Sequence, residues 1–238
     1  MSGTKAAQQS VQEAVWESVE REARELRVGA IWAQDRSGVL GADGAMLWRV
    51  PADFKHFKAA TLGGAVVMGR TTWESLGGRP LPGRLNLVLS RRPDWQPQLV
   101  EGAASGAVVP SRSAPVSPQV QVKRSLAEAL AYAAQDVVAK GLPDPREGAY
   151  RELPRVWVIG GGSVYKQALN TGLVDELLVT ELNLDVSGRT AALDAGLVVR
   201  APQFDAASWQ PGPMTDAAGT WRPVSGDAAW RVEHWLNH

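Results

Sequence analysis

The sequence predicts a single α/β domain. Apolar runs of strand length alternate with segments that carry helix-start signals, which is typical of α/β folds. These runs are residues 28–34, 65–68, 85–89, 155–159 and 176–182. From Trp209 the tail is strand-like and holds two turn signals, so we expect a closing antiparallel hairpin. No linker divides the 238 residues, a length at the upper end for one domain.

Composition excludes several classes of function. The 25 basic and 25 acidic residues balance, so no overall field attracts nucleic acid or an acidic membrane. No apolar segment is long enough to span a bilayer. The absence of cysteine excludes disulfides and thiolate chemistry, and the three histidines lack metal-ligand spacing. We expect a cytoplasmic monomer with no metal, no nucleic-acid partner and no membrane partner.

Residues 1–27 form a predicted helical extension ahead of a domain that spans 28–238. Ser10 and Glu13 make a capping box, and an apolar residue recurs about every fourth position after it. The stretch lacks the apolar core of a secretory signal. Two interpretations stay open. The helix either docks on its own domain or offers a contact surface to a partner.

The first strand, residues 28–34, leads into a glycine-rich loop at 35–44. Three glycines in ten residues make this loop a candidate mobile lid. The loop runs directly into Met46, Trp48 and Asp53. We therefore expect this loop to cover a ligand bound by Met46, Trp48 and Asp53.

Asp53 begins a predicted helix that covers residues 52–61. Pro51 suits the first helical position, and an acid in the first turn complements the helix dipole. Asp53 and Phe57 are four residues apart and share one helix face. An acid beside aromatic side chains is suited to a flat, polar heterocycle. The alternative is an ordinary dipole-complementing acid next to core aromatics.

Phosphate-binding signals follow two predicted strands. After residues 65–68 the chain reads Gly69-Arg70-Thr71-Thr72 and enters a helix, where backbone N–H groups, a hydroxyl and a guanidinium converge. After residues 85–89 come Ser90, Arg91 and Arg92, which could clamp a second phosphate or form a solvated basic turn. The stiff turn before that strand ends in Arg84.

A third glycine signal lies in the second half of the chain. Residues 93–119 read as a surface insertion, followed by a short strand at 120–122 and a capped helix at 125–140. Residues 142–154 form a predicted loop. The strand at 155–159 then meets Gly160-Gly161-Gly162 and a helix at 163–171, which suits a pyrophosphate. Thr180 is the single hydroxyl within the apolar run 176–182 and needs a partner.

Together these motifs resemble the dihydrofolate reductases. They occur in that family's order over about residues 28–182, and the first strand looks most like the actinobacterial branch. The matching stretches are 31–34, 46–58, 67–76, 79–86, 89–91 and 158–165. The resemblance implies a central, mixed, mostly parallel eight-stranded sheet flanked by helices, with the C-terminal antiparallel hairpin at its edge.

The resemblance also implies an activity. It is the NADPH-dependent reduction of 7,8-dihydrofolate to tetrahydrofolate, with hydride delivered to C6 and a proton to N5. This reaction feeds one-carbon metabolism, and the enzymes that catalyse it are targets of antifolates. NADPH is the implied cofactor and dihydrofolate the implied small-molecule partner. Two alternatives remain. One is the pyrimidine reductase of riboflavin synthesis, which should lack the Trp48-to-Asp53 motif, and the other is a non-catalytic nucleotide-binding protein.

Site residues carry over from the family position by position. The implied catalytic residues are Asp53, Thr180, Trp48 and Met46. The implied substrate-binding residues are Ile31, Trp32, Ala33, Asp53, Phe57, Lys58, Arg84, Ile159, Tyr165 and Thr180. The implied cofactor-binding residues are Ala33, Leu40, Gly41, Gly69, Arg70, Thr71, Thr72, Leu89, Ser90, Arg91, Ile159, Gly160, Gly161, Gly162, Ser163, Val164 and Tyr165.

The resemblance assigns chemistry to a few of these residues. Asp53 would hold the pterin, with its pKa raised by desolvation, and Thr180 would bond to it. Arg84 would pair with the substrate's α-carboxylate. Arg70, Ser90 and Arg91 would surround the adenosine 2′-phosphate. In the family the Gly160–Gly161 peptide is cis. Leu47 departs from the pattern, since proline usually precedes the tryptophan.

Overall fold

The computed structural model describes residues 26–99, 120–139 and 144–238. Predicted features at 1–25, most of the insertion at 93–119 and residue 140 lie outside these ranges. Residues 93–99 have no regular secondary structure. The first described residues already belong to the fold, because Leu26 is buried in the core and Arg27 forms an ion pair with Glu176.

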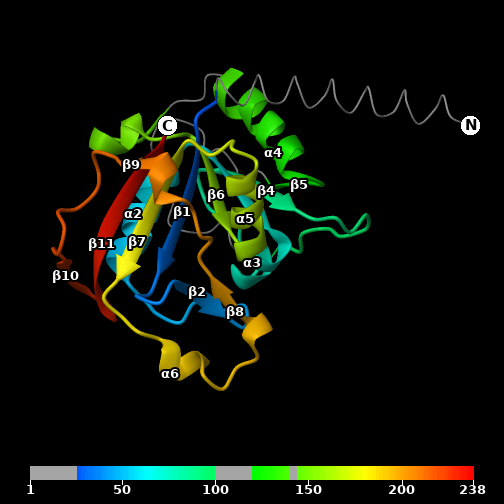
Figure 1. The fold of residues 1–238 in the computed structure, drawn as a ribbon. Helices are drawn as coiled ribbons and strands as arrows, with labels where there is room; N and C mark the ends of the chain where they lie inside the picture. Colours follow the sequence, from blue (N-terminus) through cyan, green and yellow to red (C-terminus); the bar gives the residue numbers. More distant parts are fainter. Residues whose placement is uncertain (1–25, 100–119, 140–143) are drawn as a thin grey trace, which may run out of the picture.

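The central sheet is mixed and mostly parallel, as predicted (Figure 1). Eight strands follow one another in the order β10-β11-β7-β1-β6-β3-β4-β5, and β9 adds to the outer part of β11. The strands are β1 Val28–Gln34, β3 Ala65–Gly69, β4 Leu85–Leu89, β5 Val120–Lys123, β6 Val156–Gly160, β7 Glu176–Leu182, β9 Trp209–Pro211, β10 Arg222–Ser225 and β11 Ala228–Asn237.

The direction of the strands decides where a site can form. The pairs between β5 and β7 along that order are all parallel, whereas β11 runs antiparallel to β7 and β10 antiparallel to β11. The parallel strands therefore end together at one edge, where ligands bind in open α/β sheets. The C-terminal hairpin extends the sheet beyond β7, and the predicted hairpin is confirmed.

Helices cover both faces of the sheet. They are α2 Pro51–Thr61, α3 Arg70–Ser75, α4 Leu126–Ala133, α5 Gly162–Asn170 and α6 Ser187–Thr190. Side chains of α4 and α5 pack with Val28, Ala30 and Trp32 in one core, and those of α2 and α3 pack with Ile31 and Trp157 in the other. Figure 1 shows α5 and α2 on opposite faces. Alternate residues of β1 thus enter different cores, as the pleat of a strand requires.

Local sequence explains how the helices start. Pro51 occupies the first turn of α2, as predicted, and Asp53 follows it in the same turn. The capping box before α4 is confirmed, because the Glu128 N–H donates to Ser125 Oγ at 3.1 Å and the Arg124 N–H donates to the Glu128 carboxylate at 2.8 Å. The first bond satisfies an N–H group that the helix itself leaves unpaired, and the second ties the Glu128 side chain to the residue just before the cap.

Several predicted elements need correction. The 35–44 stretch is not a loop throughout, because Val39–Ala42 forms strand β2, which pairs with β8 Val198–Arg200. The α-helix predicted to reach residue 140 ends at Ala133 and continues as a π-helix, Ala134–Ala139. The predicted loop 142–154 contains the 3₁₀ helix Gly148–Glu152. The β2–β8 pairing is long-range, and sequence periodicity over four residues cannot reveal it.

The segment between β7 and β9 carries elements that sequence analysis did not assign. Besides α6 and β8 it contains two short 3₁₀ helices, Ala195–Leu197 and Ala206–Ser208. In Figure 1 the arrowheads of β1 and β7 point toward the β2–β8 ribbon. This ribbon therefore lies at the edge of the sheet where the parallel strands end.

Candidate functional site

A cleft of about 1240 Å³ opens at the carboxyl ends of the parallel strands. It collects residues from β1, β3, β4, β6 and the helices that follow them, together with the β2–β8 ribbon. A cleft of this size takes a large ligand or two ligands side by side. Every substrate-binding and cofactor-binding residue predicted from the sequence lines it except Thr180, which lies behind Asp53.

Asp53 is the central acid of the cleft. Its residue is only 7% exposed, and burial raises its pKa from 3.8 to about 6. The Thr180 side chain forms a hydrogen bond with this carboxyl group, which lowers the pKa in part. Burial penalises the charged form because the cleft solvates a carboxylate less well than water does. Asp53 can therefore hold a proton near neutral pH, which an ordinary surface aspartate cannot.

Thr180 is held by the centre of the sheet. It sits on β7 between Ala33 of β1 and Val232 of β11, and it is 1% exposed. A hydroxyl in that position is fixed by two neighbouring strands rather than by a mobile loop. The strand register thus places the partner of Asp53.

The two other predicted catalytic residues occupy different positions. Met46 lies on the cleft wall and is 52% exposed, whereas Trp48 is 6% exposed and packs in the core beneath α2. The Trp48 Nε1–H has no hydrogen-bond partner among the described residues. A buried indole N–H normally has a partner, so this group fits an ordered water or a ligand atom.

Arg84 is a buried cation in the wall of the cleft, close to Phe57. Its guanidinium donates to Thr61 Oγ1 at 2.9 Å and to the Pro82 carbonyl at 3.2 Å, and it lies 5.8 Å from the Phe57 ring. Burial lowers its pKa to about 10, so it stays charged at neutral pH. Within the described ranges no carboxylate pairs with Arg84, and a buried unpaired cation is expensive. An anionic group of a ligand would compensate it.

The glycine turn forms the floor of the other half of the cleft. The Gly160–Gly161 peptide is cis, as the resemblance implies. Gly160 has φ +122, and a Cβ there would meet Tyr165 at 3.3 Å and Thr72 Oγ1 at 3.4 Å, so glycine is required. The Tyr165 hydroxyl donates to the Ile31 carbonyl at 2.7 Å, and burial together with the charge of Asp53 raises its pKa. Tyr165 thus ties the turn to β1.

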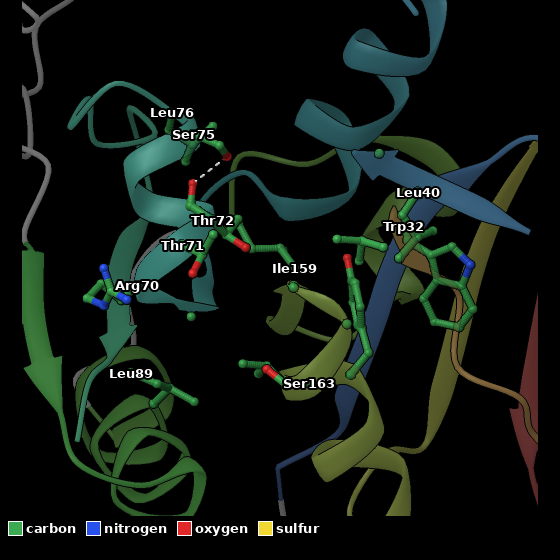
Figure 2. A pocket seen from close by; sticks show the side chains of 18 of the residues that line it. Trp32, Leu40, Arg70, Thr71, Thr72, Ser75, Leu76, Leu89, Ile159 and Ser163 are labelled. Atoms are coloured by element: carbon green, nitrogen blue, oxygen red, sulfur yellow. Dashed lines mark hydrogen bonds between the residues drawn. The ribbon is translucent and has the colours of Figure 1, made fainter. Parts of the chain in front are cut away.

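Groups suited to phosphate face one another across this half of the cleft. Figure 2 shows Arg70, Thr71 and Thr72 on α3 opposite Ile159 and Ser163. The residue before α5, Gly161, makes no side-chain cap, so the first N–H groups of that helix are available for an anion. Arg70 forms an ion pair with Glu74 at 2.6 Å, and Ser90 and Arg91 lie at the end of β4. Backbone donors, hydroxyls and cations together suit a dinucleotide.

Sequence reasoning missed part of the lining. The missed residues are Ala42, Gly44, Ala45, Phe54, Ser75, Leu76, Leu81, Arg124, Ser125, Leu126, Gln167, Val198, Val199 and Arg200. One signal was available for Arg124 and Ser125, since a capping box directly after a strand places a helix start at the cleft edge. No local signal marks β8, because it reaches the cleft only by pairing with β2.

The described residues carry no sign of a metal centre or of a membrane span. Among them no group of three or more His, Cys, Asp or Glu side chains could hold a metal ion. Within the same ranges no helix is long and apolar enough to cross a bilayer.

Comparison with known proteins gives a consistent result. The family model described as Dihydrofolate reductase matches residues 27–211. The dihydrofolate reductase of Mycobacterium leprae is 41% identical over 144 residues, which is 60% of this chain and 65% of the relative, so the match spans just under two thirds of that protein. The dihydrofolate reductase of Neisseria gonorrhoeae is 31% identical over 89% of this chain and 98% of its own length.

A solved structure agrees with this result. The dihydrofolate reductase of Enterococcus faecalis, complexed with NADP(H) and RAB-propyl, superimposes with a TM-score of 0.60 at 29% identity. The match covers 89% of this chain and 96% of the other.

Proposed function

Because the chain belongs to the dihydrofolate reductase family, we propose that it reduces 7,8-dihydrofolate to tetrahydrofolate with NADPH. One observation carries the proposal. A buried acid, Asp53, lies in the same cleft as a glycine turn suited to pyrophosphate and a buried arginine, Arg84, for which the described residues supply no carboxylate partner. Each of these three groups is suited to bind one part of the two ligands. These parts are the pterin ring, the dinucleotide and the substrate's carboxylate.

Asp53 binds the pterin and holds the proton. Its carboxyl group accepts hydrogen bonds from the 2-amino group and ring N3, in the orientation that Thr180 fixes. A pKa of about 6 keeps part of the Asp53 population protonated near neutrality, which is the condition for a general acid. The resemblance gives Trp48 the role of orienting a water between the acid and N5, and its buried Nε1–H has no hydrogen-bond partner among the described residues. NADPH supplies the hydride to C6.

The chain's own residues fit NADPH. The uncapped start of α5, with Gly160, Gly161 and Gly162 before it, binds the pyrophosphate, and Thr72 faces the same turn. Arg70, Ser90 and Arg91 bind the adenosine 2′-phosphate at the far end of the cleft. A 2′-phosphate contact of this kind favours NADPH over NADH, because NADH leaves the arginines without an anion.

Arg84 binds the substrate's α-carboxylate. Its guanidinium is buried, charged at neutral pH and already oriented by Thr61 and the Pro82 carbonyl. Orientation before binding lowers the entropy cost of forming a bidentate pair. Phe57, which lies beside Arg84, packs against the ring system between the pterin and that carboxylate.

A direct assay tests the proposed function. We expect dihydrofolate-dependent loss of NADPH absorbance and a much lower kcat/KM with NADH. The Arg91→Ala variant should lose affinity for NADPH and keep its weak affinity for NADH, because only NADPH presents the 2′-phosphate. No turnover with dihydrofolate would contradict the function. Equal losses for both cofactors would place the 2′-phosphate elsewhere.

A cytoplasmic location and a monomeric state belong to the same proposal. Gel filtration with light scattering measures the oligomeric state, and a stable dimer at micromolar concentration would contradict it.

A further inference from the structure

The segment 35–47, here called the lid segment, forms one wall of the cleft. It connects β1 to the stretch before α2, and it contributes Leu40, Gly41 and Met46 to the lining. Its middle part is β2, paired with β8 outside the central sheet. The middle of the lid segment is therefore held in place by β8 and not by the central sheet.

Asp35 is buried at the root of the lid segment. The residue has no exposed surface, although it carries a carboxylate. One oxygen accepts from the Ser37 N–H at 2.9 Å and the Val39 N–H at 2.8 Å, and the other accepts from the Val186 N–H at 3.0 Å. A buried carboxylate persists only when several donors compensate its lost hydration.

The two oxygens of Asp35 connect different parts of the chain. The bonds to Ser37 and Val39 are local and would cap a turn anywhere. The bond to Val186 is not local, since Val186 follows β7 and precedes α6. It joins the lid segment to the segment that covers it from outside.

That outer segment, residues 184–201, makes further contacts with the lid segment (Figure 1). The Arg36 N–H donates to the Leu184 carbonyl at 3.0 Å and the Asp43 N–H donates to the Leu197 carbonyl at 2.9 Å. The Ala201 N–H donates to the Gly38 carbonyl at 2.8 Å, and Arg189 donates to the Leu47 carbonyl. Both ends of the lid segment are thus bonded to residues 184–201.

We propose that Asp35 is the positioning residue that holds the lid segment over the cofactor half of the cleft, through its bond to Val186. It touches neither ligand and acts through Leu40 and Gly41. The inference rests on the proposed function for its cofactor and adds a residue that neither the family motifs nor the cleft lining includes.

Asp35→Asn separates the two roles of the carboxylate. An amide keeps one oxygen for Ser37 and Val39, and it turns an NH₂ toward the Val186 N–H, so two donors face each other. The local turn survives while the long-range bond is lost. Ser37→Ala is the matched control, because it removes only the hydroxyl bonds to Asp35 and leaves the bond to Val186.

Two measurements besides turnover read out the position of the lid segment. For Asp35→Asn we expect NADPH to dissociate about three- to tenfold faster, the effect of one hydrogen bond, with faster amide exchange at residues 39–43. Ser37→Ala should match the wild type in both. A purely structural role would lower the melting temperature of Asp35→Asn and leave the dissociation rate of the folded protein unchanged, which would overturn the proposal.

A second variant guards against loss of folding. Arg189 is exposed, so Arg189→Ala should fold, and it removes the contact at the other end of the lid segment. If Asp35→Asn does not fold, Val186→Pro takes its place, because proline lacks the N–H that Asp35 accepts. Faster NADPH dissociation in Val186→Pro, as in Arg189→Ala, supports the proposal, and an unchanged rate in Val186→Pro overturns it. A wild type that fails to bind NADPH contradicts the proposed function instead, and amide exchange in the variants still tests the position of the lid segment.

Discussion

At the scale of single residues, the burial of Asp53 lowers the stability of the folded protein at neutral pH and raises the pKa of the acid. Its pKa of about 6 lies above the value of 3.8 for an unfolded chain, so the folded protein binds more protons between those two pH values. The free energy of unfolding therefore falls as pH rises through this window, and the cost is complete above about pH 6. Two pKa units correspond to about 3 kcal/mol.

Replacing this acid should separate activity from stability. We expect Asp53→Asn to lower hydride transfer at neutral pH by orders of magnitude, because the amide cannot donate a proton. It should raise the free energy of unfolding by about 1–3 kcal/mol at pH 8, because no charge is buried. Stopped-flow rates and urea unfolding measure the two effects.

The pH dependence supplies the control. In the wild type, kcat/KM for dihydrofolate should fall as pH rises above about 6, since the protonated acid is lost. Asp53→Asn should lack this titration, and its stability gain should vanish near pH 4, where the wild-type acid is already protonated. An active Asn variant at pH 7 would contradict the role of the acid.

At the scale of elements, a glycine allows close packing between β1 and β6 in the centre of the sheet. Gly29 of β1 lies opposite Trp157 of β6, and a Cβ on Gly29 would come within 2.3 Å of the indole ring. Trp157 is fully buried, so the ring has no free space to enter. The glycine lets a large aromatic side chain cover the strand without pushing β1 away from β6.

We expect Gly29→Ala to destabilise the protein by about 1–3 kcal/mol, the usual cost of overpacking a core. Gly188→Ala is the matched control, because a Cβ there meets nothing within 4 Å and its φ is ordinary. Urea unfolding of both variants checks the prediction. Equal free energies of unfolding for Gly29→Ala and Gly188→Ala would contradict the prediction, because the indole ring would then shift at no energetic cost.

At the scale of the whole molecule, the N-terminal end of the described chain lies away from the cleft. Arg27 pairs with Glu176, which begins β7, whereas the cleft forms where β7 and its parallel neighbours end. The length of β7 separates the two places. The described chain therefore begins at the edge of the sheet opposite the proposed chemistry.

Deleting residues 1–24 should leave kcat and the KM values for both ligands within about twofold of the full chain, since Leu26 and Arg27 remain. Steady-state kinetics and circular dichroism of the shortened protein measure this. A collapse in kcat with intact folding would show that the extension contributes to the site.

Local sequence was sufficient for most elements, whereas the list of candidate residues came from the resemblance to the dihydrofolate reductases. Prolines, glycines and capping residues act within a few positions, so the starts of α2, α4 and α5 could be predicted. Asp53, the Gly160 turn and Arg84 stand out because their chemistry is unusual where they occur. Leu47, where the family has proline, packs a partly buried side chain against the core that contains Trp48, and its backbone carbonyl accepts a hydrogen bond from Arg189.

The sequence by itself determined the α/β class, the strands β1, β3, β4, β6 and β7 with the helices that follow β3 and β6, and the motifs from which part of the cleft lining could be named. Tertiary structure alone decided the pairing of β2 with β8 and the burial of Asp35 against Val186, whereas the raised pKa of Asp53 confirms what the resemblance implied. Pairing, burial and desolvation each depend on residues far apart in sequence. No local pattern encodes them, because they exist only once those distant residues are in contact.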